Sequence, residues 1–358
     1  MKTVGIVAEY NPFHSGHALH VRESRRLAEE ETTIVAVMSG DYVQRGEPAI
    51  YDKFARAEAA VRGGVDLVAE LPIWISLSSA EGFAAGALKI LKELHAEILS
   101  FGSETGNLEP LLEIAYLFRQ QDFLESVRQE LREKPEQSFA KARQSVAERV
   151  LNRELPELKQ PNNILAIEYL KACSGMTPFA VRRHGAGHDQ KGESDYPSAS
   201  QIRDILRAEG KGPDADLQEL LFLDRLRQCS RNHFPDDGLG ERMYREIRNQ
   251  NSYEEYIRAC ATRRFPLARV RRTALRAILN IQDAEPAYIR ILAFNEKGQA
   301  LLRKQKILPL LIKPAHVRKM GEEALKQFEM TSQAHDLYQL MNHHTASGED
   351  WRRGPAKV

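Results

Sequence analysis

Two histidines near the N-terminus, His14 and His17, are the side chains best placed to do chemistry. They are separated by Ser15 and Gly16 and follow an apolar run at residues 4–9. A strand that runs into a helix brings free N–H groups and the positive helix end to one point, which suits a phosphate. A glycine there lets the backbone approach closely, and two imidazoles can stabilise charge on a pentacovalent phosphorus. We therefore interpret the segment as a nucleotide phosphate site rather than a helix start with surface histidines.

A second group of phosphate-binding residues lies much further along the chain. Ser198 and Ser200 stand at a predicted helix start, and Arg203 follows within one turn. Alone, this pattern is typical of an ordinary serine-capped helix. Together with His14 and His17 it favours a second contact to a triphosphate.

A charged loop follows the second predicted strand. Arg45, Lys53 and Arg56 carry the charge to steer an anionic substrate. Asp41 has the chemistry of a base or of a magnesium-orienting carboxylate. A hydrated turn with charged flanks explains the same residues equally well, so both interpretations stay open.

Residues 262–276 form one dense basic segment that contains no acidic residue. Arginine binds phosphates with a planar fork and stacks on bases, so a local excess of arginine favours a nucleic-acid backbone over a solvated helix face. The candidate contact residues are Arg263, Arg264, Arg269, Arg271 and Arg272.

Apolar runs alternate with helical patterns through the first part of the chain. The predicted strands are residues 4–9, 33–39, 66–71, 96–101 and 179–182, with helices from about 16, over 51–62 and over 79–94. This alternation predicts an α/β fold with a Rossmann-like parallel sheet covered on both faces. Each predicted strand ends in polar residues or glycine, as one shared cleft at the carboxyl edge requires.

The pattern divides the chain into two predicted domains. Residues 1–205 form the α/β domain that contains the nucleotide phosphate site, with a helical insertion at about 105–172. Residues 206–358 form a mostly helical domain that carries the basic segment, with helices that include 286–293 and 322–340 and a poorly ordered end at 343–358.

Composition narrows the class of protein. The chain has 358 residues and a net charge of +1, so any basic surface is local. Its three cysteines form no C-x-x-C pair, which argues against a structural zinc site or a disulfide framework and fits a reducing cytoplasm. No apolar run reaches membrane-spanning length, so we expect a cytoplasmic protein without a membrane partner or a bound structural metal.

Several of these motifs, taken in order, resemble the bacterial tRNA(Met) cytidine acetate ligase family of the nucleotidyltransferase superfamily. They are residues 5–17, 38–49, 101–104, 161–165, 198–203 and the arginine-rich stretch near 264–272. The resemblance implies that ATP and acetate give acetyl-adenylate and pyrophosphate. The exocyclic amine of the wobble cytidine of elongator tRNA(Met) then attacks the acetyl group, which gives N4-acetylcytidine and AMP. ATP, with Mg²⁺, acetate and that tRNA are the implied substrates, and no DNA partner is expected.

The resemblance makes residues 1–205 a nucleotidyltransferase-like, ATP-binding catalytic domain and residues 206–358 a tRNA-binding domain. It also assigns roles to individual residues. His14 and His17 would stabilise the α-phosphate, and Ser198, Ser200 and Arg203 would hold the β- and γ-phosphates. Whether Arg182 or Arg183 fills the remaining arginine role stays open, and we favour Arg183. The other implied ATP-site residues are Val7, Ala8, Glu9, Tyr10, Asn11, Pro12, Phe13, Ser15, Gly16, Ala18, Leu19, His20, Gly102 and Asn162.

Two other functions share the first motif. An adenylyltransferase would move AMP to a small phosphorylated acceptor, but it would not need the arginine-rich helical region. A non-catalytic nucleotide- or RNA-binding protein on the same scaffold would not need both histidines.

Overall fold

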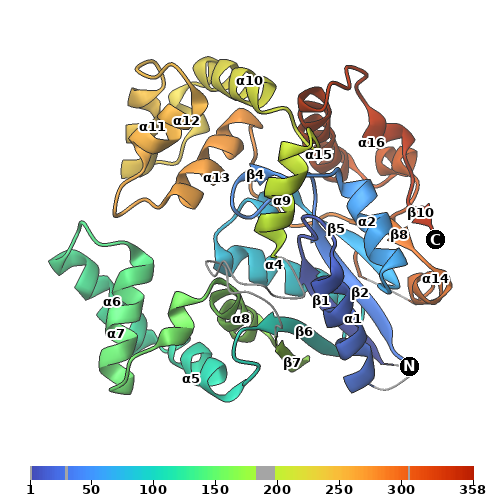
Figure 1. Ribbon diagram of the computed structural model, residues 1–358, viewed down its shortest axis with the longest axis horizontal. Helices are drawn as coiled ribbons and strands as arrows, with labels where there is room; N and C mark the ends of the chain where they lie inside the picture. The colour runs from blue at the N-terminus through green and yellow to red at the C-terminus, as the bar shows by residue number, and fades with distance from the viewer. Residues whose placement is uncertain (1, 29–30, 183–197, 305–306) are drawn as a thin grey trace.

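A parallel sheet forms the centre of the molecule. The computed structural model describes residues 2–28, 31–182, 198–304 and 307–358 (Figure 1). Five parallel strands follow the order β5-β2-β1-β6-β7 within an eight-stranded sheet. They are β1 (Thr3–Ala8), β2 (Thr33–Ser39), β5 (Leu67–Leu71), β6 (Ile98–Ser103) and β7 (Thr177–Arg182). The predicted α/β fold and its five parallel strands are confirmed.

The strand order places one crevice at the middle of the sheet. From β1 the chain moves outward to β2 and β5, and it then returns to the other side of β1 to form β6 and β7. The order therefore reverses between β1 and β6. In open α/β sheets, ligands bind beyond the carboxyl ends of the strands at such a switch point.

Helices cover both faces of this sheet because its strands are apolar on both faces. In β2, Val35 and Val37 belong to one buried cluster, whereas Ile34, Ala36 and Met38 belong to another. The helices α4 (Ala80–Glu93) and α8 (Pro161–Ala172) pack against the first face. The helices α1 (Ser15–Leu27) and α2 (Lys53–Arg62) pack on the other side.

The insertion between β6 and β7 is helical, as predicted. It contains α5 (Glu109–Leu117), α6 (Gln121–Glu133), α7 (Phe139–Leu151) and the 3₁₀ turn η1 (Pro156–Lys159) before α8. The α6–α7 hairpin projects away from the sheet, and α8 returns the chain to β6 (Figure 1).

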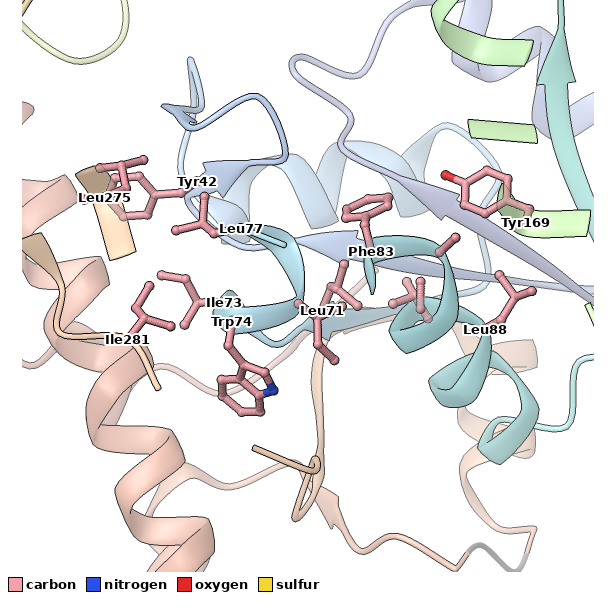
Figure 2. Close-up of a cluster of buried hydrophobic side chains, with 14 of the residues drawn as sticks. Tyr42, Leu71, Ile73, Trp74, Leu77, Phe83, Leu88, Tyr169, Leu275 and Ile281 are labelled. Carbon is pink, nitrogen blue, oxygen red and sulfur yellow. The ribbon is translucent and has the colours of Figure 1, made fainter. Parts of the chain in front are cut away.

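A group of helices follows β7 and shares the core of the first face. They are α9 (Ala199–Ala208), α10 (Ala215–Gln228), α11 (Gly238–Glu246), α12 (Tyr253–Cys260) and α13 (Leu267–Ile278), with the 3₁₀ turn η2 (Arg231–His233). Figure 2 shows Ile281 beside Ile73 of the short helix α3 (Ile73–Ser76), and Leu275 beside Tyr42. One continuous apolar cluster therefore links the sheet to the C-terminal helices.

The end of the chain differs from the prediction in two places. Residues 286–293 were expected to be a helix, but β8 (Ile289–Phe294) pairs antiparallel with β5. This strand is buried, so it lacks the polar alternation that distinguishes a surface strand from a helix segment. The expected disorder of 343–358 is also wrong, because α16 (Glu349–Arg352) and β10 (Ala356–Lys357) are ordered and β10 pairs with β8.

The remaining described elements lie between the segments already named and towards the end of the chain. They are β3 (Tyr42–Val43), β4 (Glu47–Pro48), α14 (Glu296–Leu302), β9 (Leu310–Leu311), the 3₁₀ turn η3 (Pro314–Lys319) and α15 (Glu322–Met341). The predicted helix at 322–340 is confirmed as α15. Across the described residues, no helix has the length and apolarity needed to span a bilayer.

Candidate active site

The two histidines fix each other at the start of α1. His14 is the N-cap residue, and its Nδ1 accepts a hydrogen bond from the Gly16 N–H at 3.0 Å. The His14 N–H in turn donates to Nδ1 of His17 at 3.3 Å, and the two ring centroids lie 3.9 Å apart. Because each Nδ1 is an acceptor, each neutral ring carries its proton on Nε2. The arrangement therefore provides two Nε2–H donors at a helix N-terminus.

Gly16 is required by the position of the His14 ring. A Cβ atom at residue 16 would lie 2.8 Å from Cε1 of His14, which is too close for two carbons. We expected this glycine to admit a phosphate to the backbone. The structure shows that it also leaves room for the imidazole to cap the helix.

The loop before α1 is held from several sides. Tyr10 is buried, with a φ of 44°, and its ring meets the rings of Phe13 and His17 edge-on at centroid distances of 5.0 Å. The side-chain oxygen of Asn11 accepts a hydrogen bond from the Ile50 N–H at 2.8 Å. The loop geometry thus depends on contacts with residues 40–50.

The other predicted residues of this motif occupy β1, the loop and the first turns of α1. Val7, Ala8 and Glu9 are half-buried at the end of β1. His20 lies one turn into the helix, where its Nε2 is 2.9 Å from Oγ of Ser100 in β6. The remaining members are Pro12, which is buried, Ser15, which is exposed, and Ala18 and Leu19, which are half-buried.

The far side of the crevice is built where β6 meets α8. Gly102 is half-buried in β6, and Glu104 follows the strand. One carboxylate oxygen of Glu104 accepts from Nδ2 of Asn162 at 2.6 Å, and the other accepts from the Asn163 N–H at 3.0 Å. Glu104 therefore caps the N-terminus of α8, which has no side-chain cap of its own. Sequence reasoning named Asn162 but missed Glu104 and Asn163, although both lie in motifs that carried the resemblance.

The serine–arginine segment closes onto the histidine loop. Ser198 caps α9, and Arg203 donates to the Asn11 carbonyl at 2.8 Å and to Oγ of Ser200 at 3.1 Å. Burial, followed by repulsion from Arg207, lowers the pKa of Arg203. The structure thus brings together two groups of residues whose direct contact, from Arg203 to Asn11, spans 192 positions.

Arg183 lies outside the described residues. Its alternative, Arg182, is exposed at the end of β7.

The loop at residues 40–50 places its charged residues differently from our expectation. Arg45 is exposed, and its charge lies close enough to Glu9 to lower the pKa of that carboxyl, which burial raises more strongly. Asp41, in contrast, is buried. Its carboxylate accepts from the Lys53 N–H at 2.8 Å and pairs with Nδ1 of His335 at 2.7 Å. This placement corrects the expectation of a base or a magnesium ligand, because Asp41 is occupied by internal partners.

Lys53 is also internal and does not face a substrate. Its ammonium lies 2.9 Å from Glu70 and 2.8 Å from Asp350, and its side chain has no exposed surface. Arg290 completes this buried group at 3.0 Å from Asp350. The expected steering role is therefore replaced by a structural one.

Arg56 organises the ends of two strands, and sequence reasoning gave it only a steering role. It is buried and donates to the carbonyls of Glu9 at 2.6 Å and Ser39 at 3.2 Å, and also to that of Gly40. Only its place in a helix next to apolar residues hinted at burial.

The arginine-rich segment splits into two sets. Arg263, Arg264 and Arg269 are exposed, although Arg269 pairs with Asp237 at 2.7 Å. In contrast, Arg271 pairs with Glu47 and Glu254, and Arg272 donates to the Gln44 carbonyl at 3.1 Å. Arg271 and Arg272 therefore attach α13 to the loop, which corrects their assignment as free contacts for a nucleic acid.

The described residues offer no cluster of three or more metal-ligating side chains. The carboxylates of Glu9 and Glu104, which lie at the crevice, already accept backbone N–H groups. This donor set does not fit a protein-bound magnesium ion.

The chain is similar to known proteins along most of its length. The model of the HIGH nucleotidyl transferase family matches residues 1–233 and, in a second stretch, 216–352. The tRNA(Met) cytidine acetate ligase of Thermoanaerobacter sp. (strain X514) is 37% identical over 390 residues, which covers 95% of each chain. The Fervidobacterium nodosum protein of the same name is 31% identical, over 91% of this chain and 87% of that one.

Two solved structures extend the likeness to the fold. Thermotoga maritima TmcAL in an apo form superposes with a TM-score of 0.90 at 28% identity over the whole of both chains. A second form of that protein, bound with alpha-thio ATP, gives a TM-score of 0.88. With identity above 30% along almost its full length, the chain belongs to the tRNA(Met) cytidine acetate ligase family.

Proposed function

We propose that this protein is an ATP-dependent ligase that acetylates N4 of the wobble cytidine of elongator tRNA(Met). The observation that carries the proposal is the pair of Nε2–H donors on His14 and His17, fixed at a helix N-terminus beside the β1/β6 switch point. Donors preorganised in this way stabilise charge as it develops on a phosphate.

In the first step, a carboxylate oxygen of acetate attacks the α-phosphorus of ATP. The bond from that phosphorus to the oxygen bridging to the β-phosphate breaks, and pyrophosphate leaves. His14 and His17 donate to the α-phosphate oxygens. The α9 N-terminus, with Ser198, Ser200 and Arg203, holds the leaving phosphates.

In the second step, the cytidine N4 attacks the acetyl carbon of acetyl-adenylate. The bond from this carbon to the phosphate oxygen breaks, AMP leaves, and N4 loses one proton. The cytosine amine is a weak nucleophile, so the mixed anhydride supplies the activation. A wobble base lies in a single-stranded loop, where a protein can turn it outward into a site.

ATP enters with magnesium held by its own phosphates and water, since the crevice carboxylates are occupied. Exposed Arg263 and Arg264 contact the tRNA backbone. We place the reaction in the cytoplasm, where tRNA is used.

The direct test is transfer of labelled acetate to purified elongator tRNA(Met), with and without ATP. The control substrate is the same tRNA with its wobble cytidine replaced. ATP-dependent labelling of the first tRNA alone is the expected result. Formation of a dinucleotide from ATP and a phosphorylated acceptor, without labelled tRNA, would instead support an adenylyltransferase. ATP binding without pyrophosphate exchange under any condition would support a non-catalytic protein.

A further inference from the structure

Gln44 is the one described residue whose main chain joins the end of β1 directly to the arginine-rich helix. Its N–H donates to the carboxylate of Glu9 at 2.8 Å. Its carbonyl accepts from the guanidinium of Arg272 at 3.1 Å. The path from α13 to the end of β1 is therefore two hydrogen bonds and one residue long.

The loop around Gln44 is pressed closely against α13. Gly46 has a φ of 79°, and a Cβ atom there would lie 2.6 Å from the Arg272 backbone nitrogen. Arg271 pairs with Glu47 on the same loop. The loop backbone thus has little freedom to move independently of the helix.

Arg45 lies between Gln44 and Gly46, and its side chain is exposed. Its charge is close enough to that of Arg203 to contribute to the lowered pKa of Arg203, after burial and the charge of Arg207. Arg203 in turn donates to the Asn11 carbonyl of the histidine loop. A shift of the loop at Gln44 therefore moves a cation beside the residues assigned to the phosphates.

We infer that Arg272 is a positioning residue for adenylate formation, acting through the main chain of Gln44 on Glu9 and Arg45. The inference rests on the proposed function. It separates Arg272 from the exposed arginines, because its contribution is made before any tRNA is bound. The Arg272 guanidinium is half-buried against the loop and donates to the Gln44 carbonyl, whereas Arg263 and Arg264 are exposed.

The test is acetate-dependent ATP–pyrophosphate exchange in the absence of tRNA. We expect Arg272→Ala to lower kcat/KM for ATP at least tenfold, and Arg272→Lys, which keeps one donor, to recover most of it. The matched control is Arg276→Ala. Arg276 is also half-buried on α13 and donates to a carbonyl at 3.1 Å, but that carbonyl belongs to Trp74 in α3. The control should change the exchange rate less than twofold.

A double-mutant cycle adds a readout that general destabilisation would not reproduce. If Arg272 acts through Arg45, Arg272→Ala should lower kcat/KM for ATP less than twofold when it is introduced into the Arg45→Ala variant. Thermal unfolding of the Arg272→Ala and Arg276→Ala variants verifies that both are folded.

Three results would overturn the inference. Exchange at the wild-type rate in Arg272→Ala, with only the KM for tRNA raised, would make Arg272 a simple tRNA contact. Equal losses in Arg272→Ala and Arg276→Ala would indicate general loosening of α13. Full additivity with Arg45→Ala would exclude the route through that residue.

Failure of the proposed function is recognised separately, because the wild-type protein would then show no acetate-dependent exchange. In that case calorimetric ATP binding still tests the Arg272 link. We expect at least tenfold weaker binding in Arg272→Ala and unchanged binding in Arg276→Ala, and equal binding in the two variants would overturn it.

Discussion

The ammonium of Lys53 lies 2.8 Å from the carboxylate of Asp350, and neither side chain has exposed surface. The two residues are 297 positions apart, and they connect α2 to the last helix of the chain. The C-terminal segment therefore helps to hold α2 in place against the central sheet.

Removing one partner of this pair should destabilise the protein strongly. We expect Asp350→Ala to lower the free energy of unfolding by about 3–5 kcal/mol, because the two buried cations Lys53 and Arg290 would then share one carboxylate, that of Glu70. Denaturant unfolding measures the change. Glu322→Ala, which removes an exposed i,i+4 ion pair with Lys326, is the control and should leave the free energy of unfolding close to that of the wild type. A loss of similar size in the control would contradict the assignment.

His335 should make stability depend on pH above neutrality. Burial alone would lower its pKa, but the charge of Asp41 and the hydrogen bond to it raise the pKa to about 9. Because the folded-state pKa exceeds the unfolded value of about 6.5, the stabilisation is complete below pH ~6.5 and disappears as pH rises through 9. This pKa shift corresponds to about 3 kcal/mol of free energy of unfolding.

The measurement is the difference in unfolding free energy between wild type and His335→Gln across this pH range. Glu349 contacts the other ring nitrogen at 3.1 Å, and the charges of Lys53 and Asp350 also act on the ring, so all three stay unchanged in the comparison. A difference that stays constant from pH 6 to 9.5 would show that His335 does not titrate as described.

His17 should be essential for activation of acetate but not for tRNA binding. We expect His17→Ala to lower acetate-dependent ATP–pyrophosphate exchange by about 10²–10³-fold, the usual loss for one preorganised donor to a developing anion. Filter binding should give an unchanged Kd for tRNA. Exchange within threefold of wild type would remove His17 from the proposed mechanism.

Gly16→Ala tests the same site without removing an imidazole. The new Cβ would lie 2.8 Å from Cε1 of His14, so the ring must rotate and lose its bond to the residue 16 N–H. We expect exchange activity to fall at least tenfold while both histidines remain. Gly175→Ala is a control in open space, although its φ of 79° carries backbone strain, and it should leave exchange unchanged.

The exposed arginines should carry the salt-dependent part of tRNA binding. Replacement of Arg263 and Arg264 with alanine should make the dependence of tRNA affinity on salt less steep. The slope of log K against log salt concentration should decrease in magnitude by about 1–2, since each phosphate contact contributes ~0.7–0.9. Pyrophosphate exchange without tRNA should not change. An unchanged salt slope would place the tRNA backbone elsewhere on the protein.

The sequence alone predicted the local parts of this protein well. The alternation of apolar runs and helical patterns predicted five parallel strands in their correct places, because strands buried on both faces leave long apolar runs between amphipathic helices. The motifs at residues 14–17 and 198–203 also carried their own helix caps, which are local interactions and can be read from the spacing.

Only the tertiary structure decided which charged residues face the substrates and which are internal. Asp41, Lys53, Arg271 and Arg272 looked like surface groups, but their partners lie 12 to 297 positions away, and no local pattern announces such pairs. The same holds for β8, whose identity depends on an antiparallel neighbour rather than on its own apolar sequence. Local periodicity determines helices and strands, whereas pairing and burial depend on which distant segments meet.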